Sequence, residues 1–259
     1  MDLSFVILIF AIGFVGSFIS GMLGIGGSII KYPMLLYIPS FLGFIAFNAH
    51  EVSGISAVQV LFASIAGVWA FRKENYLNKS LILIMGTNIL IGSFIGGYGS
   101  KYLTVEKINF TYAILATIAA VMMLFPKKGL DHIPHEPVTY NKILASILAL
   151  IIGASAGIVG AAGAFILVPV LLVVLKIPTK MTIATSLAIT FISSIGTTVG
   201  KVMTNQVLYI PALIMIVASI LASPLGANLS KKVDSMVLRG MLAILILGTA
   251  IKIWFDIIS

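Results

Sequence analysis

Long runs of apolar residues without a charged side chain recur along the whole chain. Eight such stretches contain no Asp, Glu, Lys or Arg, namely residues 3–30, 32–50, 52–71, 80–100, 108–126, 143–175, 181–200 and 202–230. An α-helix needs about 20 predominantly apolar residues to cross a bilayer. The runs lack the alternation of apolar and polar residues that a membrane β-barrel requires. The pattern therefore predicts an all-α fold, a polytopic transmembrane helical bundle.

Two sets of matching residues relate the first half of the chain to the second. In the first set, the two members of every pair are the same number of residues apart, and we call that number the first offset. This set pairs Gly21, Gly24, Gly27 and Pro33 with Gly157, Gly160, Gly163 and Pro169. The second set has a slightly smaller separation, the second offset, and pairs Ser56, Ser64, Ser93, Gly96, Ser100 and Lys101 with Ser186, Ser194, Ser223, Gly226, Ser230 and Lys231. Such repetition indicates two homologous halves. We predict a first transmembrane repeat (1–125), a cytoplasmic hinge loop (126–142) and a second repeat (143–259).

Each half contains five hydrophobic segments, and the second segment of each half is unusual. The segments are 3–21, 28–46, 52–71, 80–99 and 108–125, then 143–158, 163–175, 182–200, 208–228 and 237–255. The first unusual segment is interrupted by Lys31, Pro33 and Pro39, and the other would give only about 20 Å of helix. If both cross the membrane, the halves form an inverted repeat of five plus five segments. If both turn back, the protein has eight passes with re-entrant segments.

The charge distribution favours the inverted repeat. With ten crossings, the loops 72–79, 126–142, 176–180 and 229–239 share one side and carry 11 of the 16 Lys and Arg residues. With eight passes, the basic residues divide about evenly. Cytoplasmic loops are rich in Lys and Arg, so we expect the basic side to face the cytoplasm. This topology accounts for the net charge of +8 without nucleic acid as a partner.

Composition excludes a soluble domain and most enzyme classes. Only 9% of the residues are charged, compared with about a quarter in soluble domains. The chain has no cysteine, and its histidines are His50, His132 and His135, the last two in the hinge. It contains no phosphate-binding loop and no Gly-x-Ser-x-Gly nucleophile motif. We therefore expect no metal, no cofactor and no enzymatic activity.

Glycine-rich sequences precede the two unusual segments, at residues 24–28 and 160–164. Irregular backbone at membrane depth is tolerated only where it is buried in protein or lines a cavity. The helix that follows such a break begins with unpaired N–H groups, which favour anions. Paired broken helices are typical of secondary transporters. We predict two anion-binding breaks that face each other near the membrane midplane; the alternative is close packing of small residues.

Polar residues near the breaks extend the predicted site. Hydroxyl groups at the start of the third segment of each half could bind an oxyanion or cap the helix. Lys31 follows the first break and either reaches an interface or meets an anion. The predicted substrate-binding residues are Gly24, Gly26, Gly27, Ser28, Lys31, Ser53, Ser56, Gly160, Ala161, Gly163, Thr185 and Ser186.

Five further residues have two interpretations each. His50 and Glu51 could form a proton relay, or they could lie in an interfacial loop where a glutamate favours the start of a helix. Gln59, Asn88 and Thr190 could line the transport path or make hydrogen bonds between helices.

The paired glycine-rich motifs, each followed six residues after its last glycine by Pro33 or Pro169, resemble the sulfite exporter TauE/SafE family, as does Ala184-Thr185-Ser186-Leu187. The resemblance covers nearly the whole chain and both repeats. It implies a multi-pass permease for sulfite, organosulfonates or related sulfur anions in the inner (cytoplasmic) membrane of a bacterium or archaeon. The sequence departs from the family pattern at Ala161 and Ala162, where glycine is more usual, and at residues 52–56.

These observations together predict a secondary transporter that exports a small sulfur oxyanion by alternating access. Its expected partners are the lipid bilayer, the anion and a coupling ion, either H⁺ or Na⁺, and an oligomer is compatible with the sequence. The alternatives are an anion channel or uniporter, a non-transporting membrane scaffold or assembly protein, and a membrane-embedded enzyme that depends on His50 and Glu51.

Overall fold

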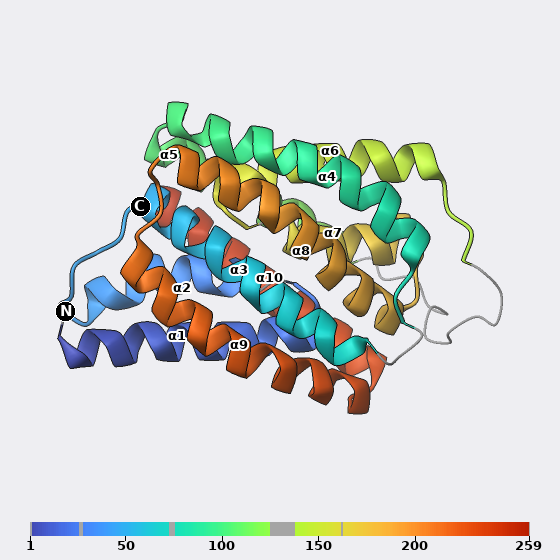
Figure 1. The fold of residues 1–259 in the computed structure, drawn as a ribbon, viewed down its shortest axis with the longest axis horizontal. Coiled ribbons are helices and arrows are strands. Elements are labelled where there is room, and N and C mark those ends of the chain that lie inside the picture. The colour runs from blue at the N-terminus through green and yellow to red at the C-terminus, as the bar shows by residue number, and fades with distance from the viewer. Residues whose placement is uncertain (1, 26–27, 73–75, 125–137, 162, 259) are drawn as a thin grey trace.

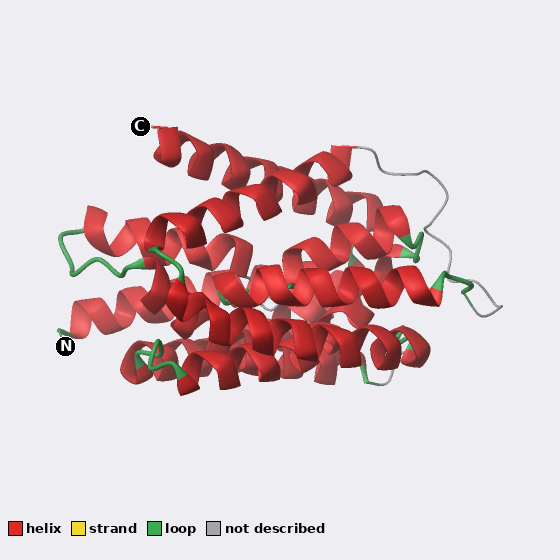
Figure 2. Ribbon diagram, turned by 90° about the horizontal axis from the view of Figure 1, so that it is seen from above, coloured by secondary structure: helices red, strands yellow, loops and turns green. Residues whose placement is uncertain are grey.

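The computed structural model describes residues 2–25, 28–72, 76–124, 138–161 and 163–258, and these ranges form helices joined by loops (Figures 1 and 2). The first five helices are α1 (Leu3–Leu23), α2 (Ser28–Phe41), α3 (Ala49–Phe71), α4 (Lys79–Gly99) and α5 (Val105–Leu124), with a 3₁₀ turn η1 (Ser100–Tyr102) before α5. The others are α6 (Lys142–Val159), α7 (Ala164–Pro169), the π-helical η2 (Val170–Val174), α8 (Thr179–Met203), α9 (Tyr209–Lys232) and α10 (Ser235–Ile258).

Eight of these helices are long and apolar enough to cross a membrane, which confirms the predicted polytopic all-α fold. The two other α-helices of the described ranges are short. Helix α7 has six residues, as predicted for the segment 163–175. Helix α2 has 14 residues and continues through Pro33 and Pro39, so the predicted interruption at these residues does not break it. Most of the predicted hinge, including His132 and His135, lies outside the described residues.

The chain passes back and forth along one long axis. In Figure 1, α1 and α3 run in the same direction, so α2 and the loop after it return the chain to the end where α1 begins. Helices α3 and α9 finish at the other end, where α4, α6 and α8 begin. We call that end the basic end, because the loops there are the ones rich in Lys and Arg.

The two halves of the chain are interleaved. Helix α1 packs against α9, and α4 packs against α6, so each of these close pairs joins one helix from each half (Figure 1). The packing defines a first group of helices (α1, α2, α3, α9 and α10) and a second group (α4 to α8). The groups meet mainly where α3 packs on α8 and α5 packs on α10.

Glycines allow the backbones of the paired helices to touch. A Cβ atom on Gly96 would lie 1.9 Å from the carbonyl oxygen of Ala154, and one on Gly226 would lie 1.9 Å from that of Phe18. The second offset relates Gly96 to Gly226, and the first offset relates Phe18 to Ala154. The two contacts therefore follow the sequence repeat and are built in the same way.

Both predicted breaks are present, and glycine is required at each. Helix α1 ends at Gly24 with φ +74°, and α6 ends at Gly160 with φ +77°, both left-handed caps that glycine adopts without strain. A Cβ atom on Gly160 would lie 2.0 Å from the carbonyl oxygen of Ser53, and one on Gly24 would lie 2.8 Å from that of Ile183. Each break thus packs against the third segment of the other half.

Replacing Gly96 by Ala should destabilise the protein, because its methyl group would enter the backbone of α6. Overpacking of this kind costs about 1–3 kcal/mol. The matched control is Gly99→Ala, further along the same helix α4, where no atom lies within 4 Å of the added carbon. Thermal unfolding of the purified proteins should show a lower midpoint for Gly96→Ala alone; equal midpoints would contradict the close helix contact.

Candidate functional site

The two breaks lie toward opposite ends of the bundle. Gly160 packs against Ser53 and Gly24 against Ile183, each in the second turn of its helix, α3 or α8. Because α3 and α8 run in opposite directions (Figure 1), these positions are far apart along the axis. The prediction that the breaks face each other is wrong. Helix α1, with 21 residues, and α6, with 18, each carry the chain most of the way across before the break.

A buried lysine lies just beyond the first break. The ammonium group of Lys31 donates to Gln59 Oε1 and lies 3.4 Å from Ser17 Oγ. The amide of Gln59 donates to Ser17 Oγ at 2.8 Å and to Ser219 Oγ, and the two serine oxygens are 2.8 Å apart. These four residues, here the Lys31 cluster, come from α2, α3, α1 and α9 and are fully buried. Lys31 turns inward, so the alternative that it reaches an interface is wrong.

Gly16 makes room for this lysine. A Cβ atom at Gly16 would lie 2.2 Å from Cγ of Lys31, so the side chain of Lys31 lies directly on the backbone of α1. The position of the ammonium group therefore depends on the glycine that immediately precedes Ser17.

The fold itself does not require a polar cluster at this depth. The positions related to Lys31, Gln59 and Ser219 by the two sequence offsets are Leu167, Ile189 and Ile89, which are all fully buried apolar residues. Burying a charge costs several kcal/mol, and a well-packed apolar replacement is often as stable or more so. Under the predicted duplication, the second half therefore packs these positions with apolar side chains.

A second buried lysine lies beside the second break. The ammonium group of Lys201 donates to Ser53 Oγ at 2.7 Å, Ser100 Oγ at 2.7 Å, Gln206 Oε1 at 2.9 Å and the carbonyl oxygen of Ile158 at 3.0 Å. We call Lys201, Ser53, Ser100 and Gln206 the Lys201 cluster. It lies opposite the basic end, where α3 begins and α8 finishes.

Of the Lys201 cluster, only Ser53 is among the substrate-binding residues predicted from the sequence. The available signal was the isolation of Lys201, because it is the only charged residue between positions 181 and 230. A lone lysine in so long an apolar run belongs inside the bundle with polar partners.

Two of the other predicted hydroxyl groups have structural partners. Ser186 donates to the carbonyl oxygen of Gly24 at 2.8 Å, and Thr185 donates to that of Tyr76 at 3.2 Å, so both residues hold loops and breaks in place. Ser56 and Thr190 differ, because their buried oxygens find no hydrogen-bond partner among the described residues. Buried polar atoms are seldom left unpaired. These two therefore are free to bind a ligand or water.

Several remaining predicted residues fit their structural interpretation. Glu51 forms a capping box with Asn48 at the start of α3, and Asn88 donates to a carbonyl oxygen of its own helix. His50 contacts Gln206 Oε1 at 3.2 Å and the carbonyl oxygen of Leu103 at 3.1 Å. Beyond these, Ala161 and Gly163 are buried at the second break, Ser28 begins α2, and Gly26 and Gly27 lie outside the described residues. In the described part of the chain, no cluster of His, Asp and Glu could hold a metal.

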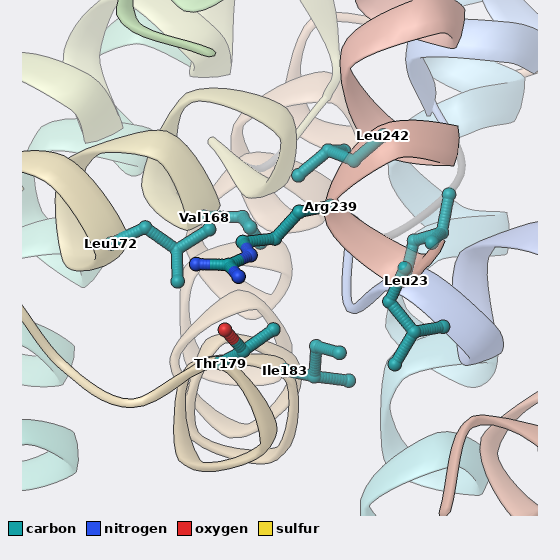
Figure 3. Close-up of a pocket in the computed structure, with 8 residues that line it drawn as sticks. Leu23, Val168, Leu172, Thr179, Ile183, Arg239 and Leu242 are labelled. Atoms are coloured by element: carbon teal, nitrogen blue, oxygen red, sulfur yellow. The ribbon is translucent and has the colours of Figure 1, made fainter. Parts of the chain in front are cut away.

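A small pocket at the basic end adjoins the first break (Figure 3). It is narrow, with room for about one water molecule, and it lies between α1 and α10 on one side and α7, η2 and α8 on the other. The guanidinium group of Arg239 extends into it above Thr179, and the other labelled residues around it are apolar. The pocket therefore places a positive charge where the two groups of helices meet. Its lining residues are Leu23, Val168, Leu172, Thr179, Ile183, Leu238, Arg239 and Leu242.

Eight candidate spans, two broken helices and buried polar clusters are features typical of a secondary transporter. The chain matches the family described as sulfite exporter TauE/SafE over residues 9–253. It belongs to that family, because the match spans nearly its whole length, and it is therefore a multi-pass membrane transporter rather than a member of an enzyme family.

Curated relatives agree with this assignment. The chain is 24% identical over 252 residues to the "Probable membrane transporter protein YunE" of Bacillus subtilis, covering 90% of this chain and 91% of the relative. A "Probable membrane transporter protein" of Xylella fastidiosa (strain 9a5c) is 26% identical over 256 residues, with coverage of 96% and 95%. One from Methanocaldococcus jannaschii is 26% identical over 250 residues, with coverage of 91% and 90%. No solved structure matches the chain significantly.

If the Lys31 cluster is functional rather than structural, Lys31→Met should melt at or above the temperature of the unsubstituted protein. The serine and glutamine side chains would still bond one another, and a buried charge would be gone. Gln59→Leu should instead lose about 2 kcal/mol or more, since it removes an acceptor from a buried ammonium group. The double variant should recover most of that loss. A large drop in melting temperature for Lys31→Met would show that the lysine holds the fold together.

Proposed function

We propose that this protein transports small sulfur oxyanions, sulfite or an organosulfonate, out of the cell by alternating access, with the Lys31 cluster at the centre of its binding site. The observation that carries the proposal is the cluster itself: a buried lysine, an amide and two hydroxyls from four helices of both halves. The unprotonated oxygens of an oxyanion accept hydrogen bonds, and all four side chains can donate them. Bonds that now join them to one another would turn to the ligand.

The buried state of the cluster favours a carrier over a channel. Lys31, Ser17, Gln59 and Ser219 are sealed from solvent in this structure, so no open pore passes through them. A carrier must close around its site in at least one state, whereas a conducting channel must connect it to both sides. Binding in a site without water also strengthens the attraction between an anion and Lys31.

We further propose that the halves form an inverted repeat in which α2 and α7 with η2 complete five passes each. Two observations support this topology. Helices α1 and α6 run in opposite directions (Figure 1), and the contacts of Gly96 and Gly226 correspond at the two sequence offsets. The proposed orientation places the basic end in the cytoplasm. The pocket at the basic end that contains Arg239, here the Arg239 pocket, then faces the cytoplasm, from which an exporter collects its anion.

Part of the site remains a proposal from the sequence alone. The breaks and the hydroxyl groups of Ser56 and Thr190 would complete the path of the anion, with H⁺ or Na⁺ as the coupling ion. A relay through His50 and Glu51 has less support, since the Glu51 carboxylate caps α3 and the His50 ring bonds Gln206. Any relay therefore involves His50 rather than the pair.

In proteoliposomes, the purified protein should move sulfite saturably, and an imposed pH or sodium gradient should change the rate. Lys31→Met should raise the half-saturating sulfite concentration at least tenfold, because a hydrogen bond to a charged group contributes about 1.5–3 kcal/mol. Gly16→Ala should have a similar effect while the charge remains, because the new methyl group displaces the lysine. Gly248→Ala, which meets no atom within 4 Å, is the matched control.

If sulfite does not move, thiosulfate, sulfoacetate and simple carboxylates should be tried in the same vesicles. Flux of one of these would change the substrate and keep the mechanism. Failure of all of them would overturn the transport proposal and favour a scaffold. Flux that does not saturate and ignores every gradient would favour a channel.

Cysteine labelling can test the topology, because the chain has no cysteine of its own. With ten crossings, Tyr102→Cys and Tyr209→Cys should both react with an impermeant maleimide added outside intact cells, and Met236→Cys should react only after permeabilisation. All three native side chains are well exposed. In the eight-pass alternative, positions 102 and 209 lie on opposite sides, so labelling of only one of them from outside would contradict the inverted repeat.

A further inference from the structure

Lys201 is held by neutral oxygens alone in the contacts that the structure shows. Its ammonium group has three protons and four acceptors, two of them serine hydroxyls, one a glutamine amide and one a backbone carbonyl. Its side chain is fully buried in the last two turns of α8. The only acidic residue of α3, Glu51, is engaged in the capping box at the start of that helix.

The fold does not need a lysine at this position either. The residue related to Lys201 by the second offset is Phe71, which is buried and apolar, and Ser53 corresponds to Ile183. An isolated buried charge is costly unless it is well bonded or binds a counter-ion. Like the Lys31 cluster, the Lys201 cluster combines one lysine, one glutamine and two serines. The residues related to Ser100 and Gln206 by the second offset are Ser230 and Tyr76, so the lysine and Ser53 are the positions where the other half is apolar.

A histidine lies at the solvent side of the Lys201 cluster. Because Lys201 can only donate, Gln206 must present Oε1 to it, and His50 Nδ1 faces that same oxygen. His50 Nε2 faces the carbonyl oxygen of Leu103. Both ring nitrogens thus lie within hydrogen-bond distance of an oxygen atom. The half-buried His50 links the cluster to the end of the bundle.

We infer that the Lys201 cluster is a second binding station for the transported oxyanion, distinct from the Lys31 cluster and nearer the end opposite the basic end. The inference rests on the proposed transport function. An anion there would accept bonds from the Lys201 ammonium group, the hydroxyls of Ser53 and Ser100 and the Gln206 amide. These groups would turn from one another to the ligand, as in the first cluster.

A row of polar residues on α3 connects the two stations. Ser53 belongs to the Lys201 cluster and Gln59 to the Lys31 cluster, and Ser56 lies between them with one turn of helix on either side. The hydroxyl group of Ser56 is buried and has no partner among the residues that the structure describes. A ligand that moves between the stations would find in Ser56 a donor with no competing bond.

The test is equilibrium binding of sulfite to the purified full-length protein in detergent, measured by calorimetry. Removing the first station with Lys31→Met should leave weaker binding that is still measurable. Adding Lys201→Met should weaken that remaining binding at least tenfold, while Lys201→Arg, which keeps the charge, should retain more of it. Lys101→Met is the matched control, an exposed lysine on η1 at the same end, and should change nothing.

Each outcome separates the inference from the function on which it rests. If Lys31→Met abolishes all binding and Lys201→Met alone binds like the unsubstituted protein, the second station is wrong and the proposed function stands. If the unsubstituted protein binds neither sulfite nor any other oxyanion of the panel, both fall. If Lys201→Met does not fold, Ser100→Ala tests the second station instead, because it removes one donor and keeps the lysine. In that case, the inference is overturned if Lys31→Met/Ser100→Ala binds sulfite as well as Lys31→Met does.

Discussion

A polar group inside a membrane protein must find its partner within the protein, because the hydrocarbon offers none. The rest of this structure follows from that constraint. The α-helices of the described ranges satisfy their own backbones, and glycines such as Gly96 let neighbouring helices approach until backbone touches backbone. The interruptions at Gly24 and Gly160 are covered by α8 and α3 of the opposite half. Polar side chains are buried in such a bundle by gathering them in clusters, and the Lys31 and Lys201 clusters are built in this way.

The two halves pack in the same way but differ in the polarity of their side chains at several related positions. At the positions related by the sequence offsets, Lys31 corresponds to Leu167, Gln59 to Ile189 and Lys201 to Phe71. At these positions, a polar residue in one half therefore corresponds to an apolar residue in the other. Under the proposed duplication, the apolar residues show what packing alone demands, and the lysines show where the chain departs from it. Each lysine lies beside one of the two breaks, Lys31 beside the first and Lys201 beside the second.

The sequence predicted the helices well because membrane spans are a local property. The segments 52–71 and 182–200 correspond to α3 (Ala49–Phe71) and α8 (Thr179–Met203), and both glycine breaks end helices as expected. The sequence did not predict the clusters, since Ser17 and Ser219 are far apart along the chain and meet only because α1 packs on α9. The direction in which Lys31 points depends on the space at Gly16. Interleaving of the halves is a long-range property that spacing along the chain does not show.

The positions of the clusters suggest how the two groups of helices could alternate. The Lys31 cluster draws all its residues from the first group, so a movement between the groups would leave its internal bonds intact. The Lys201 cluster joins the groups, because Lys201 on α8 bonds both Ser53 on α3 and Ser100 on η1 at the end opposite the basic end. The Arg239 pocket lies between the groups at the basic end. In the proposed cycle, the end opposite the basic end faces the outside of the cell. The bond of Lys201 to Ser53 closes that end in the state that this structure represents. An anion that takes over that bond would remove the contact that holds that end shut, so binding at the second station and opening toward the outside would be the same event.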